Sequence, residues 1–305
     1  MSYDQNVNSE ILMMSSQIFS IITTYNPDIT HLKKLLEIID KQTDKIVICN
    51  NSDDDLNEAD FECLSTIKIL NFRKNLGIAE AQSIGMKWAF ENGADFILQM
   101  DQDSTPHDDM VTQLVHCYNE LTSTGCQIGL VGPQDYDRIT GEINKARINK
   151  GRTINETDYF DVDSTLSSGS LIPKVAWERV GGMRDDLFID AVDHEYCWRL
   201  RDAGFLIIRN PKALLGHRLG DGRFKILSLI SVGMPSPFRH YYATRNIFLL
   251  LKEHHVPFFW KISSLIKLSG KLVFYPIFLP KGKERMRFFV KGIKDGIQGK
   301  TGKMS

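Results

Sequence analysis

The sequence has few cysteines for its length and none of the spacings that bind metals. Its five cysteines are scattered through 305 residues and form no C-x-x-C pair. An odd, scattered set argues against a disulfide framework, and the missing pairs argue against a structural zinc site. We therefore expect a protein of a reducing compartment. The cysteines are Cys49, Cys63, Cys117, Cys126 and Cys197.

Long apolar runs are missing as well. No run reaches the roughly 18 residues that a membrane-spanning helix requires, so we expect no spanning helix. The apolar residues between 11 and 22 are interrupted by Ser15, Ser16 and Gln17, and no basic residue precedes them, so we expect no secretory signal. The sequence shows no internal repeat, and its 42% hydrophobic and 25% charged residues are typical of a soluble globular protein.

Net charge is nearly absent at −1, but this balance hides an asymmetry. Residues 251–305 hold 12 Lys and Arg against 3 Asp and Glu, a local charge of +9, which leaves −10 for the first 250 residues. The same region mixes aromatic, aliphatic and lysine residues, as amphipathic helices at a membrane interface do. We expect it to contact an anionic membrane surface, and we expect no nucleic-acid partner because the aromatics lie in apolar helices. The alternative is that these helices pack on the sheet and their lysines face water.

Strand-like and helix-like segments alternate through the first 210 residues. Apolar β-branched runs predict strands, and apolar residues at helical spacing predict helices. The alternation is typical of βαβ units and predicts a doubly wound, Rossmann-like α/β sheet, mostly parallel and flanked by helices. Residues 133–163 are polar and irregular. The predicted strands are 17–24, 45–49, 67–70, 95–103, 128–131, 165–172 and 205–209, and the predicted helices are 29–40, 78–91, 106–121 and 192–203.

The stretch 95–103, DFILQMDQD, is where we expect the chemistry to concentrate. Its apolar strand ends abruptly in Asp101 and Asp103, which Gln102 separates. Ligands of open α/β sheets bind at the carboxyl ends of the strands. Two carboxylates there would hold a hard divalent cation such as Mg²⁺ or Mn²⁺, and the cation would bind a diphosphate. The alternative is a pair of solvated loop acids that cap the following helix.

A series of short motifs carries a family resemblance. They are TTYNP at 23–27, NNS at 50–52, NLGIAEAQ at 75–82, DQDS at 101–104, SGS at 168–170, LFIDAVDHEYCWR at 187–199 and HRLG at 217–220. In this order they resemble the family 2 glycosyltransferases of GT-A fold, and among them the bacterial rhamnosyltransferases that use dTDP-L-rhamnose. The resemblance covers residues 18–246 and implies a GT-A sheet and a nucleotide-sugar donor.

The resemblance assigns the reaction centre. Asp101 and Asp103 match the family's D-x-D, and His217 stands where many relatives carry a late histidine that joins the metal or the diphosphate. Asp193 matches the family's general base, although Val192 replaces the usual Glu before it. Asp193 also lies near the start of a predicted helix, where the backbone dipole favours an ionised carboxylate that can accept a proton. The alternatives are that Asp193 only caps its helix and that His217 only hydrogen-bonds within a loop.

On the donor side, the resemblance points to the ends of the first strands. Cys49 replaces the family's usual first acid, which leaves Asn50 to supply the polar contact with the pyrimidine base. Lys74 holds the position where many relatives carry Arg, so the phosphate contact beside the next helix start is open between Arg73 and Lys74. The expected donor-binding residues are Thr24, Tyr25, Asn26, Asn50, Asn51, Ser52, Arg73, Lys74, Asn75, Gly77 and Gln102.

On the acceptor side, Ser168, Gly169 and Ser170 match a family segment. A glycine there would let a sugar ring approach the backbone. Asp190 competes with the assigned base and, like Glu195, is expected beside the acceptor. Glu195 is the weaker candidate, since it can pair with an arginine four residues later on the helix.

These assignments predict an inverting glycosyltransferase. L-rhamnose would move from dTDP-L-rhamnose to a hydroxyl of a lipid-linked saccharide in O-antigen or capsule assembly, an acceptor implied only by the resemblance and the basic region. The alternatives are a UDP-hexose donor or a carbohydrate-binding protein without activity. A nucleotidyltransferase is disfavoured because no Gly-rich basic loop follows the first strand.

We expect three regions along the chain. Residues 1–16 would be a loose terminus, 17–222 the GT-A domain for donor and acceptor, and 223–305 a helical, basic, membrane-proximal region. Such an enzyme would lie in the cytoplasm, peripheral on the inner face of the cytoplasmic membrane. The sequence leaves the oligomeric state open, a homo-oligomer included.

Overall fold

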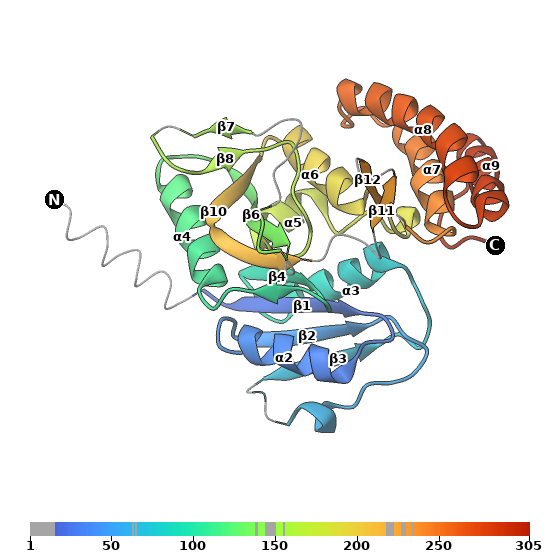
Figure 1. The fold of residues 1–305 in the computed structure, drawn as a ribbon. Helices are drawn as coiled ribbons and strands as arrows, with labels where there is room; N and C mark the ends of the chain where they lie inside the picture. The colour runs from blue at the N-terminus through green and yellow to red at the C-terminus, as the bar shows by residue number, and fades with distance from the viewer. Residues whose placement is uncertain are drawn as a thin grey trace.

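Strands from the first two-thirds of the chain pair into one ten-stranded sheet. The structure, a computed structural model, describes residues 16–62, 64, 66–137, 140–143, 151–154, 156–217, 223–226, 230–233 and 235–305. Helices cover the sheet, and three C-terminal helices gather beyond it (Figure 1). The strands of this sheet are β1 (Ile18–Thr24), β2 (Lys45–Asn50), β3 (Ile67–Asn71), β4 (Phe96–Asp101), β5 (Thr105–Pro106), β6 (Ile128–Asp137), β7 (Arg152–Thr153), β8 (Phe160–Asp161), β9 (Ser170–Pro173) and β10 (Leu206–His217).

The remaining elements are mostly helical. A separate hairpin pairs β11 (Arg223–Ile226) with β12 (Ile230–Gly233). The helices are α2 (Ile29–Ile39), α3 (Ile78–Glu91), α4 (Met110–Ser123), α5 (Lys174–Val180), α6 (Val192–Asp202), α7 (Arg239–Leu250), α8 (Phe258–Phe278) and α9 (Gly282–Ile297), with single 3₁₀ turns at Glu58–Phe61 and Asp185–Leu187.

The order of the strands places several predicted site residues at one edge of the sheet. The order is β3-β2-β1-β4-β9-β6-β10-β8-β7, with β5 paired to β10. Strands β3, β2, β1 and β4 are parallel, whereas β9 runs antiparallel between β4 and β6. Thr24 lies beside Asn50 and Thr23 beside Asp101 in the register, so the carboxyl ends of these strands meet.

Side chains of the central strands point alternately to the two faces of the sheet, so a hydrophobic core forms on each face. Successive strand residues point to opposite faces, so neighbours in β1 enter different cores. Ile21 packs into the cluster that includes Met86 of α3, and Ile22 into the cluster that includes Leu32 and Leu36 of α2. Both clusters are almost free of solvent. The expected mostly parallel, helix-flanked sheet is confirmed.

Two predicted elements differ from the structure. The helix expected from Pro106 begins at Met110, because Thr105 and Pro106 instead pair with Gly216 and Leu215 of β10. Strand β10 continues to His217, well beyond the predicted end at 209. The Asn-Pro pair that suggests a turn forms an irregularity inside the strand, and pairing with β6 resumes at Leu214.

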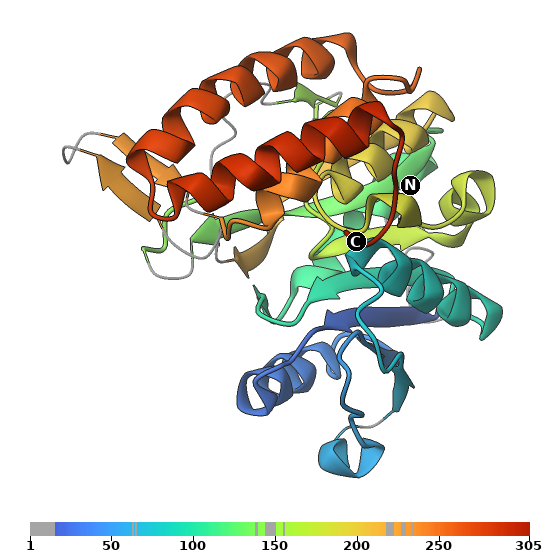
Figure 2. The same cartoon turned by 90° about the vertical axis from the view of Figure 1, so that its right-hand side faces the viewer.

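The C-terminal helices pack on one another around an apolar cluster of their own. Leu268 and Tyr275 of α8 and Phe289 of α9 are buried there. Gly292 lets α9 approach α7, because a Cβ atom at this position would lie 2.7 Å from the carbonyl oxygen of Tyr241. Helices α8 and α9 run side by side (Figure 2). Within the described ranges, none of the helices is long and apolar enough to span a bilayer.

A buried histidine in this helical cluster should make stability depend on pH. His240 is 3% exposed, and its Nε2 lies 2.6 Å from Nη1 of Arg285. Burial lowers the pKa of His240 to about 4, and the nearby Arg285 and Lys271 charges contribute. In the unfolded chain the pKa of histidine is about 6.5, so only the unfolded state takes up this proton as the pH falls from 6.5 towards 4.

Because only the unfolded state binds this proton, we expect the ionisation of His240 to lower the free energy of unfolding by about 3 kcal/mol as the pH falls from 7 to 4. Urea titrations across this range should show a shallower pH dependence for His240→Gln than for the wild type. Glutamine retains an acceptor for the Arg285 guanidinium, so the comparison isolates the ionisation. Parallel pH curves for the two proteins would contradict this account.

Candidate active site

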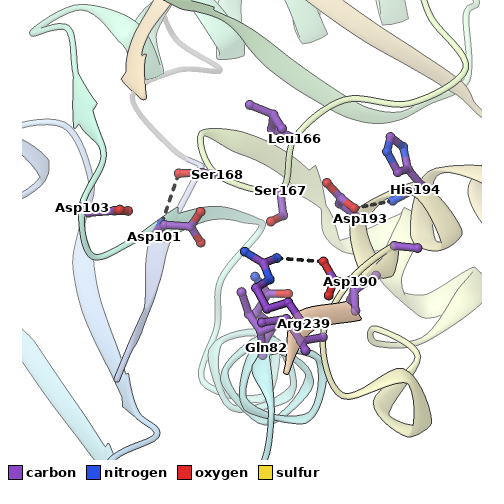
Figure 3. A pocket seen from close by; sticks show the side chains of 14 residues that line it. Gln82, Asp101, Asp103, Leu166, Ser167, Ser168, Asp190, Asp193, His194 and Arg239 are labelled. Atoms are coloured by element: carbon purple, nitrogen blue, oxygen red, sulfur yellow. Dashed lines mark hydrogen bonds and ion pairs between the residues drawn. The ribbon is translucent and has the colours of Figure 1, made fainter. Parts of the chain in front are cut away.

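A cavity of about 660 Å³ opens at the carboxyl edge of the parallel strands. Asp101 and Asp103 stand on one wall, and Asp190 and Asp193 on another (Figure 3). Elements far apart in the sequence therefore contribute acids to one space. The remaining lining residues are Ile78, Gln82, Leu166, Ser167, Ser168, Ile189, Ala191, Val192, His194 and Arg239.

The wall that carries the D-x-D residues is tied to its neighbours by hydrogen bonds. The Asp101 amide donates to Oγ of Ser168 at 3.1 Å, and the hydroxyl groups of Ser168 and Ser104 lie 2.8 Å apart. Gln102 accepts from the Tyr25 amide at 2.7 Å and donates to the Tyr25 carbonyl at 3.2 Å. Gln102, predicted to bind the donor, thus links the segment after β4 to Tyr25 at the end of β1 by two hydrogen bonds.

The oxygen atoms at this wall suit a hard divalent cation. Mg²⁺ is commonly held by one or two carboxylates together with substrate phosphate oxygens and water. Asp101 and Asp103 supply two such carboxylates on the cavity wall. Among the described residues, no group of three or more His, Cys, Asp or Glu side chains could hold a metal ion. His217, the predicted third ligand, ends β10, but its side chain lies outside the part of the chain that the structure describes.

The polar residues at the ends of β1 and β2 mostly bond to one another. Asn50 is fully buried and donates to the Asp54 carbonyl at 2.7 Å and to Oδ1 of Asn71 at 2.8 Å. The contact between Asn50 and the base stays a prediction, and in this structure the Asn50 amide nitrogen is used within the protein. Thr24 also bonds to Asn50, and Ser52 accepts from the Asn26 amide at 2.8 Å.

The predicted phosphate-binding segment has one buried and one exposed part. Oδ1 of Asn51 accepts from the Leu76 amide at 2.7 Å, and Oδ1 of Asn75 accepts from the Gly77 amide at 2.9 Å, so this loop is internally bonded. Arg73 pairs with Asp55 at 2.8 Å at the surface. None of these side chains lines the cavity, and neither do those of Tyr25 and Lys74.

Gly77 has a packing role that the sequence does not reveal. Its φ is +89°, and a Cβ atom there would lie 2.5 Å from the Phe188 ring and 2.6 Å from the Phe188 carbonyl oxygen. The Ala79 amide donates to that same oxygen at 3.4 Å. The segment that precedes α6 therefore covers the start of α3 at Gly77. A donor-binding role for Gly77 stays a prediction.

Only one member of the predicted Ser-Gly-Ser acceptor segment reaches the cavity. Ser168 lines it. A Cβ atom at Gly169 would lie 2.6 Å from Cγ of Pro133, so this glycine serves close packing and does not expose backbone to a sugar. Ser170 is fully buried and donates to the Leu166 carbonyl at 2.5 Å.

Asp193 and Asp190 approach the cavity from the start of α6 and the loop before it. Oδ1 of Asp193 accepts from the His194 amide at 2.9 Å. Asp190 pairs with Nη2 of Arg239 at 2.8 Å. Burial raises the pKa of Asp190, Arg239 opposes this shift, and the facing Asp193 carboxylate adds to it. Of these two acids, both on the cavity wall, only Asp190 pairs with an arginine among the described residues.

Glu195 is not part of this wall. Its side chain is 1% exposed and accepts from Nε of Arg199 at 2.8 Å and from Nε2 of His255 at 3.1 Å. The pairing with the arginine four residues later is confirmed. An acceptor-side role for Glu195 stays a prediction, and its buried carboxylate is paired with Arg199 and His255.

Nine of the fourteen cavity residues were not predicted as site residues, among them Arg239, Gln82 and His194. Arg239 comes from α7, beyond the segment with recognisable motifs, and Gln82 lies one turn into α3. His194 follows Asp193 directly, and its Nδ1 lies 2.7 Å from Oγ of Ser164. Gln82 and His194 lie inside motifs that the sequence singles out, whereas Arg239 lies outside all of them, so no local pattern could have identified Arg239.

Comparisons with known proteins agree with this architecture. Residues 20–170 match the family described as Glycosyl transferase family 2. The chain is 31% identical over 304 residues to "dTDP-rhamnosyl transferase RfbF" of Shigella flexneri, with 95% of this chain and 98% of that protein covered.

Solved structures resemble it at the level of the fold. The S. aureus TarS 1–349 complex with UDP-GlcNAc has a TM-score of 0.55 at 15% identity, covering 92% of this chain and 81% of that chain. GalNAc-T7 with UDP, GalNAc and Mn²⁺ has a TM-score of 0.58 at 14% identity, covering 90% and 55%. The expected GT-A fold is confirmed. With 31% identity along nearly the whole of a curated relative, this chain belongs to glycosyl transferase family 2 and is a glycosyltransferase.

Proposed function

We propose that this enzyme transfers L-rhamnose from dTDP-L-rhamnose to a hydroxyl group of a saccharide acceptor, with inversion at the anomeric carbon. The observation that carries the proposal is the shared cavity, in which the D-x-D carboxylates and the Asp193 carboxylate stand on different walls (Figure 3). A cavity of about 660 Å³ is in the range of sites for small ligands. The similarity to a protein named dTDP-rhamnosyl transferase supports the choice of donor.

In the proposed reaction the acceptor hydroxyl attacks the anomeric carbon in a single displacement. Asp193 takes the proton of that hydroxyl, the new glycosidic bond forms, and the bond from the anomeric carbon to the diphosphate oxygen breaks with its electron pair. Since one displacement inverts configuration, a β-linked donor yields an α-rhamnoside. The fixed backbone of the α6 start holds Asp193 at the wall, which keeps the base within reach of a bound hydroxyl.

Asp101 and Asp103 are the residues that would hold Mg²⁺ or Mn²⁺ against the donor diphosphate. Such an ion, when bound, supplies Lewis-acid stabilisation of the charge that grows on the departing diphosphate. The chain itself fixes the Asp101 backbone through Ser168 and the Gln102 side chain through Tyr25. These bonds hold the backbone of the D-x-D segment at the end of β4.

The donor is tested by incubating purified protein with dTDP-L-rhamnose, UDP-glucose and UDP-N-acetylglucosamine, each with and without Mg²⁺. We expect release of the nucleoside diphosphate from dTDP-L-rhamnose alone, and only with the metal. Release from a UDP-hexose instead would contradict the proposed donor and favour the second candidate, a UDP-hexose. The fold-level similarity to a structure in complex with UDP-GlcNAc is the reason for including this candidate.

We further propose a lipid-linked acceptor, as in O-antigen or capsule assembly, and docking on an anionic membrane surface. Helix α8 has two apolar sides. One packs into the C-terminal cluster through Leu268 and Tyr275. The other leaves large side chains in solvent at helical spacing, with exposed fractions of 78% for Phe258, 66% for Ile266 and 67% for Ile277.

Helix α9, which packs beside α8, also exposes apolar side chains and adds charge. Val290 is 55% exposed and Ile297 63% exposed. Lys283, Arg287 and Lys294 are exposed on the same helix at the same spacing of four and seven residues. Apolar side chains that enter the acyl boundary beside cations that meet lipid phosphates are the arrangement of a helix lying in a membrane interface.

Replacing Ile262 and Ile266 together by aspartate should release the enzyme from membranes. Burying each of these side chains in lipid is worth about 1.5–3 kcal/mol, so cosedimentation with vesicles containing anionic phospholipid should fall at least about tenfold. Val175→Asp, on α5, is the matched control because Val175 is 51% exposed but lies outside the C-terminal helices. Undiminished sedimentation of the double variant would refute this docking face.

A further inference from the structure

The segment that leads into α6 has an unusual backbone. Phe188, Asp190 and Ala191 have φ values of 64°, 72° and 65°, a left-handed region that residues with a side chain rarely adopt. At Phe188 the chain makes a tight turn in which the Ile189 amide donates to the Leu187 carbonyl at 2.7 Å. Such strain persists only where the surroundings over-determine the conformation.

Two adjacent side chains of α7 supply those surroundings. Asn246 is fully buried, and its Nδ2 lies 3.1 Å from the Leu187 carbonyl, 2.8 Å from that of Ile189 and 2.8 Å from that of Asp190. Arg245 is also fully buried and donates from Nη2 to the Leu187 carbonyl at 2.8 Å. Because these carbonyls are held from the protein interior, the Asp190 side chain is left facing the cavity.

Arg245 and Asn246 also fix each other. Nε and Nη2 of Arg245 donate to Oδ1 of Asn246 at 3.0 and 2.9 Å, which orients the Asn246 amide with its donors towards the loop. Tyr242, one turn earlier on α7, stacks its ring on Phe188 with 4.8 Å between centroids. One face of α7 therefore holds the loop against the start of α3.

We infer that Arg245 and Asn246 are positioning residues for the transfer reaction, which hold the strained loop 187–191 so that Asp190 and Asp193 face the bound sugars. The inference rests on the proposed function, because it takes Asp193 as the base. Neither side chain lines the cavity, so neither is expected to touch substrate. Both act through the backbone of loop 187–191, which leads directly into α6 and Asp193.

The test is Asn246→Ser, which removes all three Nδ2 contacts and leaves space that the loop can relax into. Binding of dTDP, measured by titration calorimetry with Mg²⁺, counts the folded donor sites. We expect kcat per binding site to fall about 10- to 100-fold, while the dTDP affinity changes less than threefold, because small displacements of a catalytic group are costly. Arg245→Lys, which keeps the charge but loses the forked donor, should show the same split more weakly.

Tyr241→Phe is the matched control. It removes a buried hydrogen bond of 3.0 Å from the same helix to Asp295 of α9, and it keeps the ring that packs with Phe188 and lies against Arg245. A loss of kcat per site as large as that of Asn246→Ser would mean that α7 matters only for general stability, and unchanged kcat per site in Asn246→Ser would also overturn the inference. If Asp193→Asn stays active while Asn246→Ser does not, the base assignment fails and the positioning role stands.

Discussion

Asp193→Asn should lose about 10²- to 10⁴-fold in kcat while still binding the nucleotide-sugar donor, the range expected when a general base is removed. The amide has nearly the shape of the carboxylate but cannot accept the proton of the attacking hydroxyl. Its Oδ1 can still accept from the His194 amide, so the start of α6 should keep its structure. Steady-state transfer rates together with donor affinity give the measurement.

Asp202→Asn is the control for this substitution. Asp202 ends the same helix, pairs with His254 at 3.1 Å and lies away from the cavity, so its activity should stay near that of the wild type. Asp190→Asn separates the two candidates for the base. A larger loss of kcat in Asp190→Asn than in Asp193→Asn would reverse the assignment.

The second large effect is expected at the D-x-D residues. Asp101→Asn should lower kcat/KM for the donor about 10²- to 10⁴-fold and weaken its dependence on Mg²⁺, because Lewis-acid stabilisation is worth several kcal/mol. The backbone bond from Asp101 to Ser168 does not involve the carboxylate and should persist. Asp103→Asn should act in the same direction. The measurement is initial rate against Mg²⁺ concentration, with a chelator as the end point.

Asp108→Asn provides the comparison here. Asp108 is an exposed acid between β5 and α4, five residues beyond the D-x-D motif, and does not line the cavity. It should leave both rate and metal dependence unchanged. Full turnover by the wild type in the presence of excess chelator would remove the metal from the mechanism.

Local patterns in the sequence predict the central strands well because burial and periodicity agree there. The run from Phe96 to Asp101 is apolar, ends in acids and forms β4, and the helical spacing after Gly77 predicts α3 with the bounds that the structure shows. The prediction is wrong at Pro106, where pairing with distant β10 outweighs the local preference for a helix start. Pairing with a distant strand cannot be recognised from the residues next to Pro106 alone.

In the candidate site, too, local motifs predict some features, whereas contacts between distant residues decide others. Asp101, Asp190 and Asp193 meet at one cavity as the motifs predict. The side chains of Asn50 and Glu195 also bond to partners that the fold brings near, Asn71 in one case and His255 in the other. Such partners lie about 20 and 60 residues away in the sequence, beyond the local spacings that capping and helix-pair rules describe.

The loop before α6 is also joined to a much later part of the chain. The Gly302 amide donates to the Asp186 carbonyl at 2.7 Å, and Arg245 donates to the Gly302 carbonyl. At roughly 5–20 residues per second, a ribosome adds residue 302 about 6 to 23 seconds after residue 186. The loop that precedes α6 therefore acquires this restraint well after strands β1 to β4 have been made.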